Sequence, residues 1–422
     1  MLLTAIAASL ALLSCKGAAE KGDGPATAAT AVTSEPGTAS KCEYPAAPPD
    51  TAAVVQIRGD ERALPCRLVL RTVLTLDNAA FDVDHLLANI VRNSRGEYIV
   101  TGRGNVLGLL DAAGKLIRTF GRDGNGPGEF HQINPLHVAA FDTVYAFDGS
   151  QRRMTVIDPS LSRLVRIVSV KALSGNQTVL PLPQSQLLVG GQIFAGMQPD
   201  TLFNTLHILK ADGSMQRAWN TDTMSANRAA RNRSKGTREL PGRSGPVMSR
   251  SLSPNADGGA LAARANSYTI EQWSKNFELV RTFERRVDWF PVLQQDGMFT
   301  YPVNDSTPAQ IYGVTTDSTT GNILVQIVIA SRKWKAPADV RRTAEGTTSS
   351  AKIMGDLTNY VDTIFESFDA HTGTLTSSAR LPGYYAPLRS DNQYWTRRGL
   401  PDGDVVIDII KLELVSNAQP AK

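Results

Sequence analysis

The stretch Phe120-Gly121-Arg122-Asp123-Gly124-Asn125-Gly126-Pro127-Gly128-Glu129-Phe130 decides how the rest of the chain is interpreted. It holds four glycines and one proline in eleven residues, and these residue types allow sharp changes of backbone direction. The run 115–120 before it alternates polar and apolar side chains, as a half-buried strand does. Because Phe130 follows the last glycine so closely, we expect its ring to fill the space between two layers. The stretch is therefore predicted to be a tight connection between strands.

This stretch closely resembles the G-x-G-P-G-E-F signature of NHL-type six-bladed β-propellers, and it occurs once in the chain. In that family the signature crosses from the outer strand of one blade to the inner strand of the next, so the resemblance implies a fold and not a chemistry. A phosphate-binding loop would open a helix and carry a Lys-Ser/Thr pair after its glycines, and the sequence has neither. The matching residues are Gly121, Arg122, Gly124, Gly126, Pro127, Gly128, Glu129 and Phe130.

A strand–turn–strand motif repeats along the chain from about residue 66, with no long stretch of helical periodicity. This pattern is typical of an all-β domain. The first two copies place Asp111 and Asp158 47 residues apart, which is close to the roughly 40 to 50 residues of one four-stranded propeller blade. The five copies of the hairpin span 109–116, 156–164, 208–215, 271–279 and 367–375.

A sixth blade is expected where the two ends of the chain meet. It would contain a final strand pair, predicted at 405–410 and 411–415. A propeller ring must close because open edge strands invite aggregation, so we predict that the strand 67–74 completes this blade. The sequence thus predicts an all-β, six-bladed propeller of four-stranded antiparallel blades over 51–416, followed by a disordered tail at 417–422.

The first fifteen residues are predicted to be a lipoprotein-type signal peptide. The run 2–13 is almost entirely apolar and too short to span a membrane, although no Lys or Arg precedes it. Leu12-Leu13-Ser14-Cys15 resembles a bacterial lipobox, which implies that Cys15 is lipidated in an exported protein; a plain secretory signal with an incidental cysteine is the alternative. Lys16 stands where Asp would favour inner-membrane retention, so the outer membrane or the periplasmic face is expected.

The segment 16–50 is rich in Ala, Gly, Pro and Thr and has few large apolar residues, so it is predicted to be a flexible tether. Cys42 and Cys66 remain as a pair if Cys15 carries lipid. Because exported proteins fold in an oxidising compartment, we expect a disulfide between them, which would contribute about 3 kcal/mol. Two free buried thiols are the alternative.

The sequence carries no assembled motif for catalysis or for metal binding. Its five histidines show neither His-x-His nor His-x-x-x-His spacing, the Gly-x-Ser-x-Gly elbow is absent, and no cofactor is implied. We therefore expect a ligand- or protein-binding scaffold at the bacterial cell envelope. The alternative is a propeller hydrolase or lyase, with or without a metal, whose site lies at the central channel. The candidate ligand-binding residues are His85, Arg103, His137, Arg152 and Tyr384.

The formal net charge is +4, and arginine is concentrated in the polar insertion 222–246, with a second basic insertion at 333–356. Long loops on rigid scaffolds often carry function, so the first insertion would attract an anionic small molecule, a polysaccharide or an envelope protein; a solvated loop is the alternative. Its arginines lack interleaved aromatic residues, so nucleic acid is not expected as a partner. Because a propeller ring is self-contained, a monomer is expected.

Overall fold

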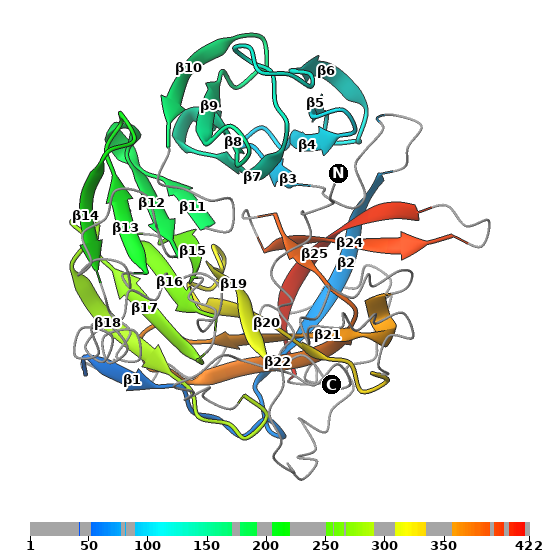
Figure 1. Ribbon diagram of the computed structural model, residues 1–422. Coiled ribbons are helices and arrows are strands. Elements are labelled where there is room, and N and C mark those ends of the chain that lie inside the picture. The colour runs from blue at the N-terminus through cyan, green and yellow to red at the C-terminus, as the bar shows by residue number, and fades with distance from the viewer. Residues whose placement is uncertain are drawn as a thin grey trace, which may run out of the picture.

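The protein is described by a computed structural model in which the regular structure is almost entirely β (Figure 1). Within the described part of the chain, the strands form six sheets. The predicted all-β, six-bladed propeller is therefore confirmed. The described residues are 42, 52–76, 81, 89–170, 178–191, 205–219, 250–255, 257–265, 267–290, 309–334, 357–388, 392–400 and 405–417.

Blades 1 to 3 each follow the chain without interruption, and each begins with the strand nearest the centre of the ring. Blade 1 contains β3 (Ile90–Arg92), β4 (Tyr98–Gly102), β5 (Val106–Leu110) and β6 (Leu116–Phe120). Blade 2 contains β7 (Ile133–Val138), β8 (Val144–Asp148), β9 (Arg153–Ile157) and β10 (Leu164–Ser169). Blade 3 contains β11 (Thr178–Pro181), β12 (Leu187–Gly190), β13 (Leu206–Leu209) and β14 (Met215–Trp219).

Blades 4 and 6 each include one strand from the amino-terminal side of the chain, whereas blade 5 does not. Blade 4 contains β15 (Arg250–Pro254), β16 (Ala260–Arg264), β17 (Thr269–Trp273), β18 (Leu279–Glu284) and β1 (Val54–Gln56). Blade 5 contains β19 (Gln310–Thr316), β20 (Ile323–Ala330), β21 (Val361–Phe368) and β22 (Leu375–Pro382). Blade 6 contains β23 (Ala386–Pro387), β24 (Gln393–Gly399), β25 (Val405–Ser416) and β2 (Cys66–Leu76).

The ring closes in blade 6 through the amino-terminal strand β2. It pairs antiparallel with β25, from Cys66 opposite Ser416 to Leu76 opposite Ile407. Figure 1 shows β2, in blue, beside the strands from the red end of the chain, so the predicted closure is confirmed. The predicted final strand pair is wrong, because 405–416 forms one continuous strand. No Gly, Pro or Asn interrupts the sequence VVIDIIKLELVS, so nothing in it favours a turn.

The segment before β2 adds to the outer edge of the ring. Strand β1 pairs parallel with β18 of blade 4, and Arg58 then bridges to Thr374 at the β21–β22 turn of blade 5. A disulfide joins Cys42 to Cys66, with their Cα atoms 5.7 Å apart. Because Cys66 starts β2, this bond lies at the seam where the ring closes. Apart from Cys42, the predicted signal peptide and tether lie outside the described residues.

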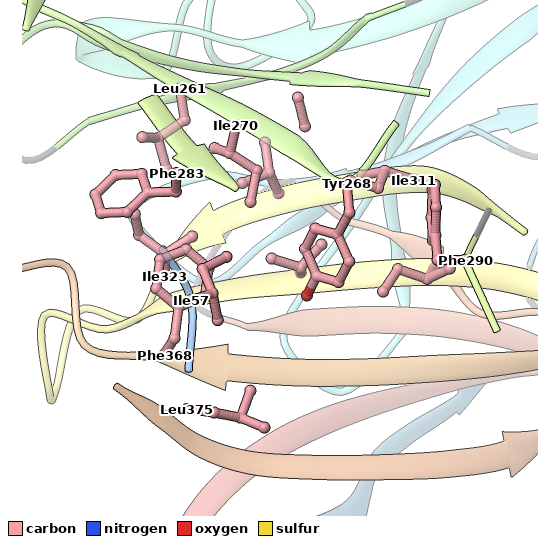
Figure 2. Close-up of a cluster of buried hydrophobic side chains, with 14 of the residues drawn as sticks. Ile57, Leu261, Tyr268, Ile270, Phe283, Phe290, Ile311, Ile323, Phe368 and Leu375 are labelled. Carbon is pink, nitrogen blue, oxygen red and sulfur yellow. The ribbon is translucent and has the colours of Figure 1, made fainter. Parts of the chain in front are cut away.

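Six clusters of buried apolar side chains lie in the described part of the chain, one between each pair of neighbouring blades. Each blade therefore buries both faces, and its inner strands lack polar alternation. In β4, Ile99 faces blade 2 while Tyr98 and Val100 face blade 6. Figure 2 shows the cluster between blades 4 and 5, where the rings of Phe283 and Phe368 lie 5.1 Å apart.

The glycine-rich stretch links outer strand β6 of blade 1 to inner strand β7 of blade 2, as predicted. Phe130 has no exposed surface and belongs to the cluster between these two blades, so its expected place between layers is confirmed. Gly121 has a φ of 87°, and a Cβ at this position would lie 2.6 Å from the Phe130 ring. Glycine is thus required at this position by both the backbone and the packing.

Candidate functional site

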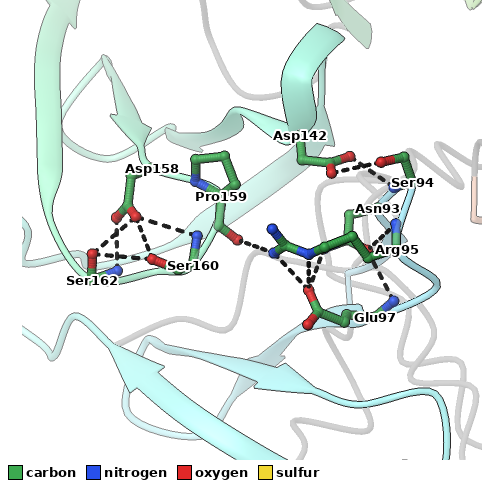
Figure 3. Close-up of polar contacts among 9 residues, drawn as sticks. All are labelled: Asn93, Ser94, Arg95, Glu97, Asp142, Asp158, Pro159, Ser160 and Ser162. Carbon is green, nitrogen blue, oxygen red and sulfur yellow. Dashed lines mark hydrogen bonds and ion pairs between the residues drawn. The ribbon is translucent and has the colours of Figure 1, made fainter.

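The propeller has two faces that differ in their connections. On the hairpin face, turns join the first strand of a blade to the second and the third to the fourth; on the junction face lie the turns between the second and third strands and the links between blades. Figure 3 shows hairpin-face turns of blades 1 and 2 in contact. Asp142 accepts hydrogen bonds from the backbone N–H and hydroxyl of Ser94, both at 2.7 Å, and Arg95 donates to the carbonyl oxygen of Pro159.

The polar groups in this part of the hairpin face are engaged by the protein itself. The carboxylate of Asp158 accepts hydrogen bonds from Ser160, Ser162 and the backbone N–H of Arg163. Partial burial favours the protonated acid, but these hydrogen bonds outweigh it and hold the pKa of Asp158 well below its ordinary value. This carboxylate therefore organises a turn, as aspartates in turns commonly do.

The junction face carries two of the predicted ligand-binding residues, Arg103 and Arg152. Both are exposed and occupy equivalent turns, between the second and third strands of blades 1 and 2. Their matching positions in consecutive repeats are confirmed. The glycine-rich loop contacts both turns: Asn105 Nδ2 donates to Asp123 Oδ1 at 3.0 Å, and Gln151 Nε2 donates to the carbonyl oxygen of Gly124 at 2.7 Å. A ligand-binding role for the two arginines stays a prediction.

The glycine-rich loop is filled by its own side chain. Glu129 Oε2 accepts the N–H of Gly126 and Oε1 accepts Arg122 Nε, both at 2.7 Å. The hydrogen bond from Gly126, then that from Arg122, lowers the pKa of Glu129. Arg153 of blade 2 donates to the carbonyl oxygens of Asn125, Gly126 and Glu129. A carboxylate of the chain thus engages the Gly126 amide that a bound anion would use.

The other predicted ligand-binding residues are dispersed. His137 lies on inner strand β7 of blade 2, as predicted, and only 3% of it is exposed. His85 lies outside the described residues, as do Cys15, the whole Arg-rich insertion 222–246 and most of the basic insertion 333–356. Tyr384 lies between blades 5 and 6, where its ring meets that of Tyr312 edge-on at 5.9 Å. Of the five candidates, Tyr384 alone is linked by a described contact to the recess that follows.

A recess of about 430 Å³, including its open mouth, lies in the central channel at blades 4, 5 and 6. Its enclosed part is only about 30 Å³, room for roughly two water molecules, so a ligand would insert only a small group there. Inner strands β15 and β19 supply two of its walls, and the β23–β24 hairpin supplies the third. Its eleven lining residues are Ser251, Leu252, Ser253, Tyr312, Gly313, Val314, Thr315, Pro387, Asn392, Gln393 and Tyr394.

Tyr312 reaches the recess because strand β19 is irregular at this point. The pairing of β19 with β20 passes from Ile311 opposite Ile327 to Gly313 opposite Gln326, so Tyr312 is the extra residue of a β-bulge. Bulges re-aim side chains and are common beside functional sites. Gly313 follows the bulge, and a Cβ at this position would lie 2.7 Å from Gln326 Oε1. Because Gly313 lines the recess and has no side chain, the Gln326 amide packs directly against it, on the side away from the recess.

Three carboxamide oxygens in this region have no hydrogen-bond partner, and two of them belong to residues that line the recess. They are Asn392 Oδ1, Gln393 Oε1 and Gln326 Oε1, on residues that are 8%, 6% and 0% exposed. Asn392 has a φ of 55°, a left-handed conformation that asparagine tolerates better than most residues. Its backbone carbonyl accepts the N–H of Leu412, so the backbone is engaged while the side-chain oxygen is not.

The recess is lined entirely by uncharged side chains. Burial raises the pKa of Tyr312 above its ordinary value of 10.0. Burial, and then the nearby charge of Asp317, raises that of Tyr394. Both phenols are therefore protonated at neutral pH and serve as hydrogen-bonding groups. The recess can bind a ligand through neutral hydrogen bonds and aromatic contact.

The described residues contain no group of three or more His, Cys, Asp or Glu side chains placed to hold a metal ion. They also contain no helix with the length and apolar character needed to cross a membrane.

Sequence reasoning missed the recess residues Tyr312, Asn392 and Gln393. The one signal of the recess in the sequence is Gly313, which interrupts an otherwise apolar strand pattern. A glycine inside a strand often marks a β-bulge or a place where another group approaches the backbone closely. Asn392 ends a turn and Gln393 begins β24, and polar residues are ordinary beside a turn. Only the closed ring brings these residues to the same wall of the channel.

Comparison with solved structures supports the fold. The chain is similar to a protein of Bacteroides fragilis described as exported, with a TM-score of 0.55 and 10% identity over 86% of this chain and 99% of that one. Weaker likenesses include virginiamycin B lyase of Staphylococcus aureus (TM-score 0.41, 11% identity, 83% and 100% covered). Another is BamB of Moraxella catarrhalis (TM-score 0.36, 12% identity, 81% and 100% covered).

At 10% identity the first likeness shows the fold alone. The other two, with TM-scores of 0.41 and 0.36, carry no argument about function. No family model matches the sequence, and no curated protein matches it. The function must therefore be argued from the site itself.

Proposed function

We propose that this protein is an exported, lipid-anchored propeller that binds a small ligand in its central channel without transforming it. The observation that carries the proposal is the pair of buried, unpartnered amide oxygens, on Asn392 and Gln393, that line one recess. Buried polar groups are nearly always satisfied, and an unsatisfied one costs about 1 to 3 kcal/mol. Two of them at one opening are best explained by an occupant that completes their hydrogen bonds.

The neutral lining supports binding over catalysis. General acid–base chemistry requires a titratable group within reach of the reacting atoms and with a pKa near the working pH. The titratable side chains that line the recess are Tyr312 and Tyr394, and burial moves the pKa of each further above neutrality. This arrangement suits a binding protein better than the alternative hydrolase or lyase.

Export is supported by the amino-terminal sequence and by the disulfide. The apolar run 2–13 ends in Leu12-Leu13-Ser14-Cys15, and the bond between Cys42 and Cys66 is of a kind that persists in oxidising compartments. A Cys15→Ser variant, expressed beside the wild type with a labelled fatty acid, tests the anchor. The label should appear in the wild type alone, and the variant should leave the membrane fraction. Label on the variant, or none on either protein, would refute lipidation at Cys15.

Native mass spectrometry of the full chain purified from cell envelopes tests the binding function. The wild type should retain an adduct of one discrete mass. Gln393→Met should lose it, because methionine has nearly the shape of glutamine without its polar atoms. Gln216→Met on exposed outer strand β14 is the matched control and should keep it. An adduct that is chemically converted on incubation would favour an enzyme, and the absence of any adduct would contradict the proposal.

A further inference from the structure

We infer that the hairpin face docks on a lipid surface through the ring of Phe141. This residue lies in the turn 139–143 between β7 and β8 of blade 2, and 94% of its surface is exposed. The inference rests on the proposed lipid anchor at Cys15 and adds the way in which the anchored propeller is oriented. Its support comes from the backbone beneath the ring, the contacts that hold the turn and the face on which the turn lies.

The backbone beneath the ring is unfavourable for phenylalanine. Phe141 and Asp142 both have a φ of 58°, and two consecutive left-handed residues in a tight hairpin turn favour Gly, Asn and Asp. A bulky side chain in this conformation is a rare and strained arrangement, of the kind that gathers at functional positions. Because the ring is also exposed, Phe141 gives the fold neither a favoured turn nor buried apolar surface. Its value must therefore lie in a contact outside the propeller.

The turn is held in place by hydrogen bonds, so the ring is presented in a fixed position. Asp142 accepts the backbone N–H and the hydroxyl of Ser94 in blade 1, both at 2.7 Å (Figure 3). The N–H of Ala139 donates to the carbonyl oxygen of Thr143 at 2.9 Å. A contact group that is ordered beforehand loses little entropy when it docks. Phenylalanine is also among the side chains that interfacial segments bury at the headgroup boundary of a membrane.

The disulfide places the proposed anchor on the same face. The end of a third strand lies at the hairpin face, and in blade 6 the third strand, β25, ends at Ser416. Cys66 pairs with Ser416 and is bonded to Cys42, so the chain that leads back to Cys15 leaves the propeller from this face. If residues 16–41, outside the described residues, form the predicted tether, their root-mean-square length would be about 28 Å. The hairpin face would then be the face held near the lipid.

The charges around the ring favour neither anionic nor cationic lipids. The four hairpin-face turns of blades 1 and 2 carry basic and acidic side chains in nearly equal number. They are Arg95, Lys115 and Arg163 against Glu97, Asp111, Asp142 and Asp158. Docking should therefore come from burial of the ring. One ring alone binds a membrane weakly, since even a single acyl chain gives only marginal binding, so docking depends on the anchor that keeps the ring close to the surface.

Tryptophan fluorescence of the anchored protein tests the docking. The full chain, with its disulfide formed, is coupled through the Cys15 thiol to a maleimide-bearing lipid in phosphatidylcholine vesicles, so natural lipidation is not required. Phe141→Trp is compared with Arg152→Trp, an exposed position on the junction face with a similar φ of 51°. When brominated lipid is included, Phe141→Trp should lose about half of the emission that it gains over the wild type. Arg152→Trp should lose none.

Thermal unfolding separates docking from a structural role of the ring. Phe141→Asn should unfold at the temperature of the wild type or above it, because asparagine tolerates the left-handed conformation. Gln184→Asn is the matched control, since Gln184 has the same φ of 58° in the equivalent turn of blade 3. A fall in melting temperature for Phe141→Asn alone would show that the ring supports the fold and would overturn the inference.

The outcomes also separate the docking from the anchor. Equal quenching of Phe141→Trp and Arg152→Trp would mean that neither face is preferred, and the inference would fail. Absence of quenching in both would exclude a lipid surface as the partner of the ring and would favour a protein. Quenching of Phe141→Trp alone, together with no fatty-acid label on Cys15 in cells, would support the contact of Phe141 with lipid and overturn only the natural anchor.

Discussion

The junction between blades 1 and 2 and the recess at blades 4 to 6 are built from similar polar residues but differ in how those residues are satisfied. At the junction, Glu129 takes hydrogen bonds from within its own loop and Arg153 donates to three carbonyl oxygens. In the recess, Asn392 and Gln393 are nine-tenths buried, with side-chain oxygens that bond to nothing. The junction's carboxylate is fully engaged and its one unpartnered buried atom is Arg153 Nε, whereas the recess leaves two acceptor oxygens without a partner.

This difference separates a structural motif from a binding site. The junction contains the strongest sequence signal in the chain, and all of its conspicuous residues serve the fold. The recess contains no recognisable motif, yet two of its side-chain oxygens have no hydrogen-bond partner within the described structure. Conspicuous residues therefore indicate where the chain must fold in one way, and unsatisfied acceptors that line an opening are the better guide to a candidate binding site.

The largest effect that the comparison predicts is on stability at the junction. Phe130→Ala should lower the free energy of unfolding by about 4 kcal/mol, because it removes a fully buried ring from a packed core. Denaturant unfolding measures the loss, and ligand affinity in the recess should not change. A loss below about 1 kcal/mol would show that the stretch does not anchor the two blades.

Arg153→Met should have a smaller effect at the same junction, about 2 kcal/mol, because charge-assisted hydrogen bonds to carbonyl oxygens are lost. The neighbouring Arg152 is exposed, so Arg152→Met is the matched control and should stay within about 0.5 kcal/mol of the wild type. Equal losses in the two variants would mean that Arg153 does not clamp the loop.

The sequence predicted the architecture well because a propeller repeats one local pattern. Turn residues such as Asp111 and Gly114 mark each hairpin, and the strand 67–74 had to pair because the ring had to close. The fifth strand β1 was not foreseen, since Val54–Gln56 is short and its parallel partner, β18, lies more than two hundred residues away in the chain. The predicted pair at 405–415 failed because no Gly, Pro or Asn marks a turn between 405 and 415, so the chain continues as one strand.

The candidate site was much less predictable than the fold. Of the residues chosen from the sequence, Tyr384 alone is linked by a described contact to the recess, through Tyr312. Asn392 and Tyr312 are 80 residues apart and face one cavity only because blades 5 and 6 are neighbours. Whether an amide is satisfied depends on everything that surrounds it, and no local pattern encodes that.

Gln393→Met should raise stability while it removes binding. The buried oxygen that it deletes has no partner, so an apolar group of the same shape should increase the free energy of unfolding by about 1 kcal/mol. The measurement is denaturant unfolding without ligand, on protein from which any adduct has been removed. A clear loss of stability would show that Gln393 is satisfied within the protein, and the contrast between the two regions would then disappear.

The smallest predicted effect is a difference in pH dependence between the two regions. The pKa of Glu129 is lowered, chiefly by the Gly126 N–H and then by Arg122. Its contribution to stability is therefore present above its ordinary pKa of 4.5 and is lost as the pH falls through the lowered value. Denaturant unfolding of Glu129→Gln should accordingly show a shallower fall in acid than the wild type.

The recess should behave differently, because the pKa values of Tyr312 and Tyr394 are raised by burial. Both phenols stay protonated between about pH 5 and pH 9, so the affinity for a neutral ligand should be flat over that range. A step in affinity near pH 7 would require a titrating group at the recess. It would remove the distinction between a junction held by charge and a recess that binds through neutral groups.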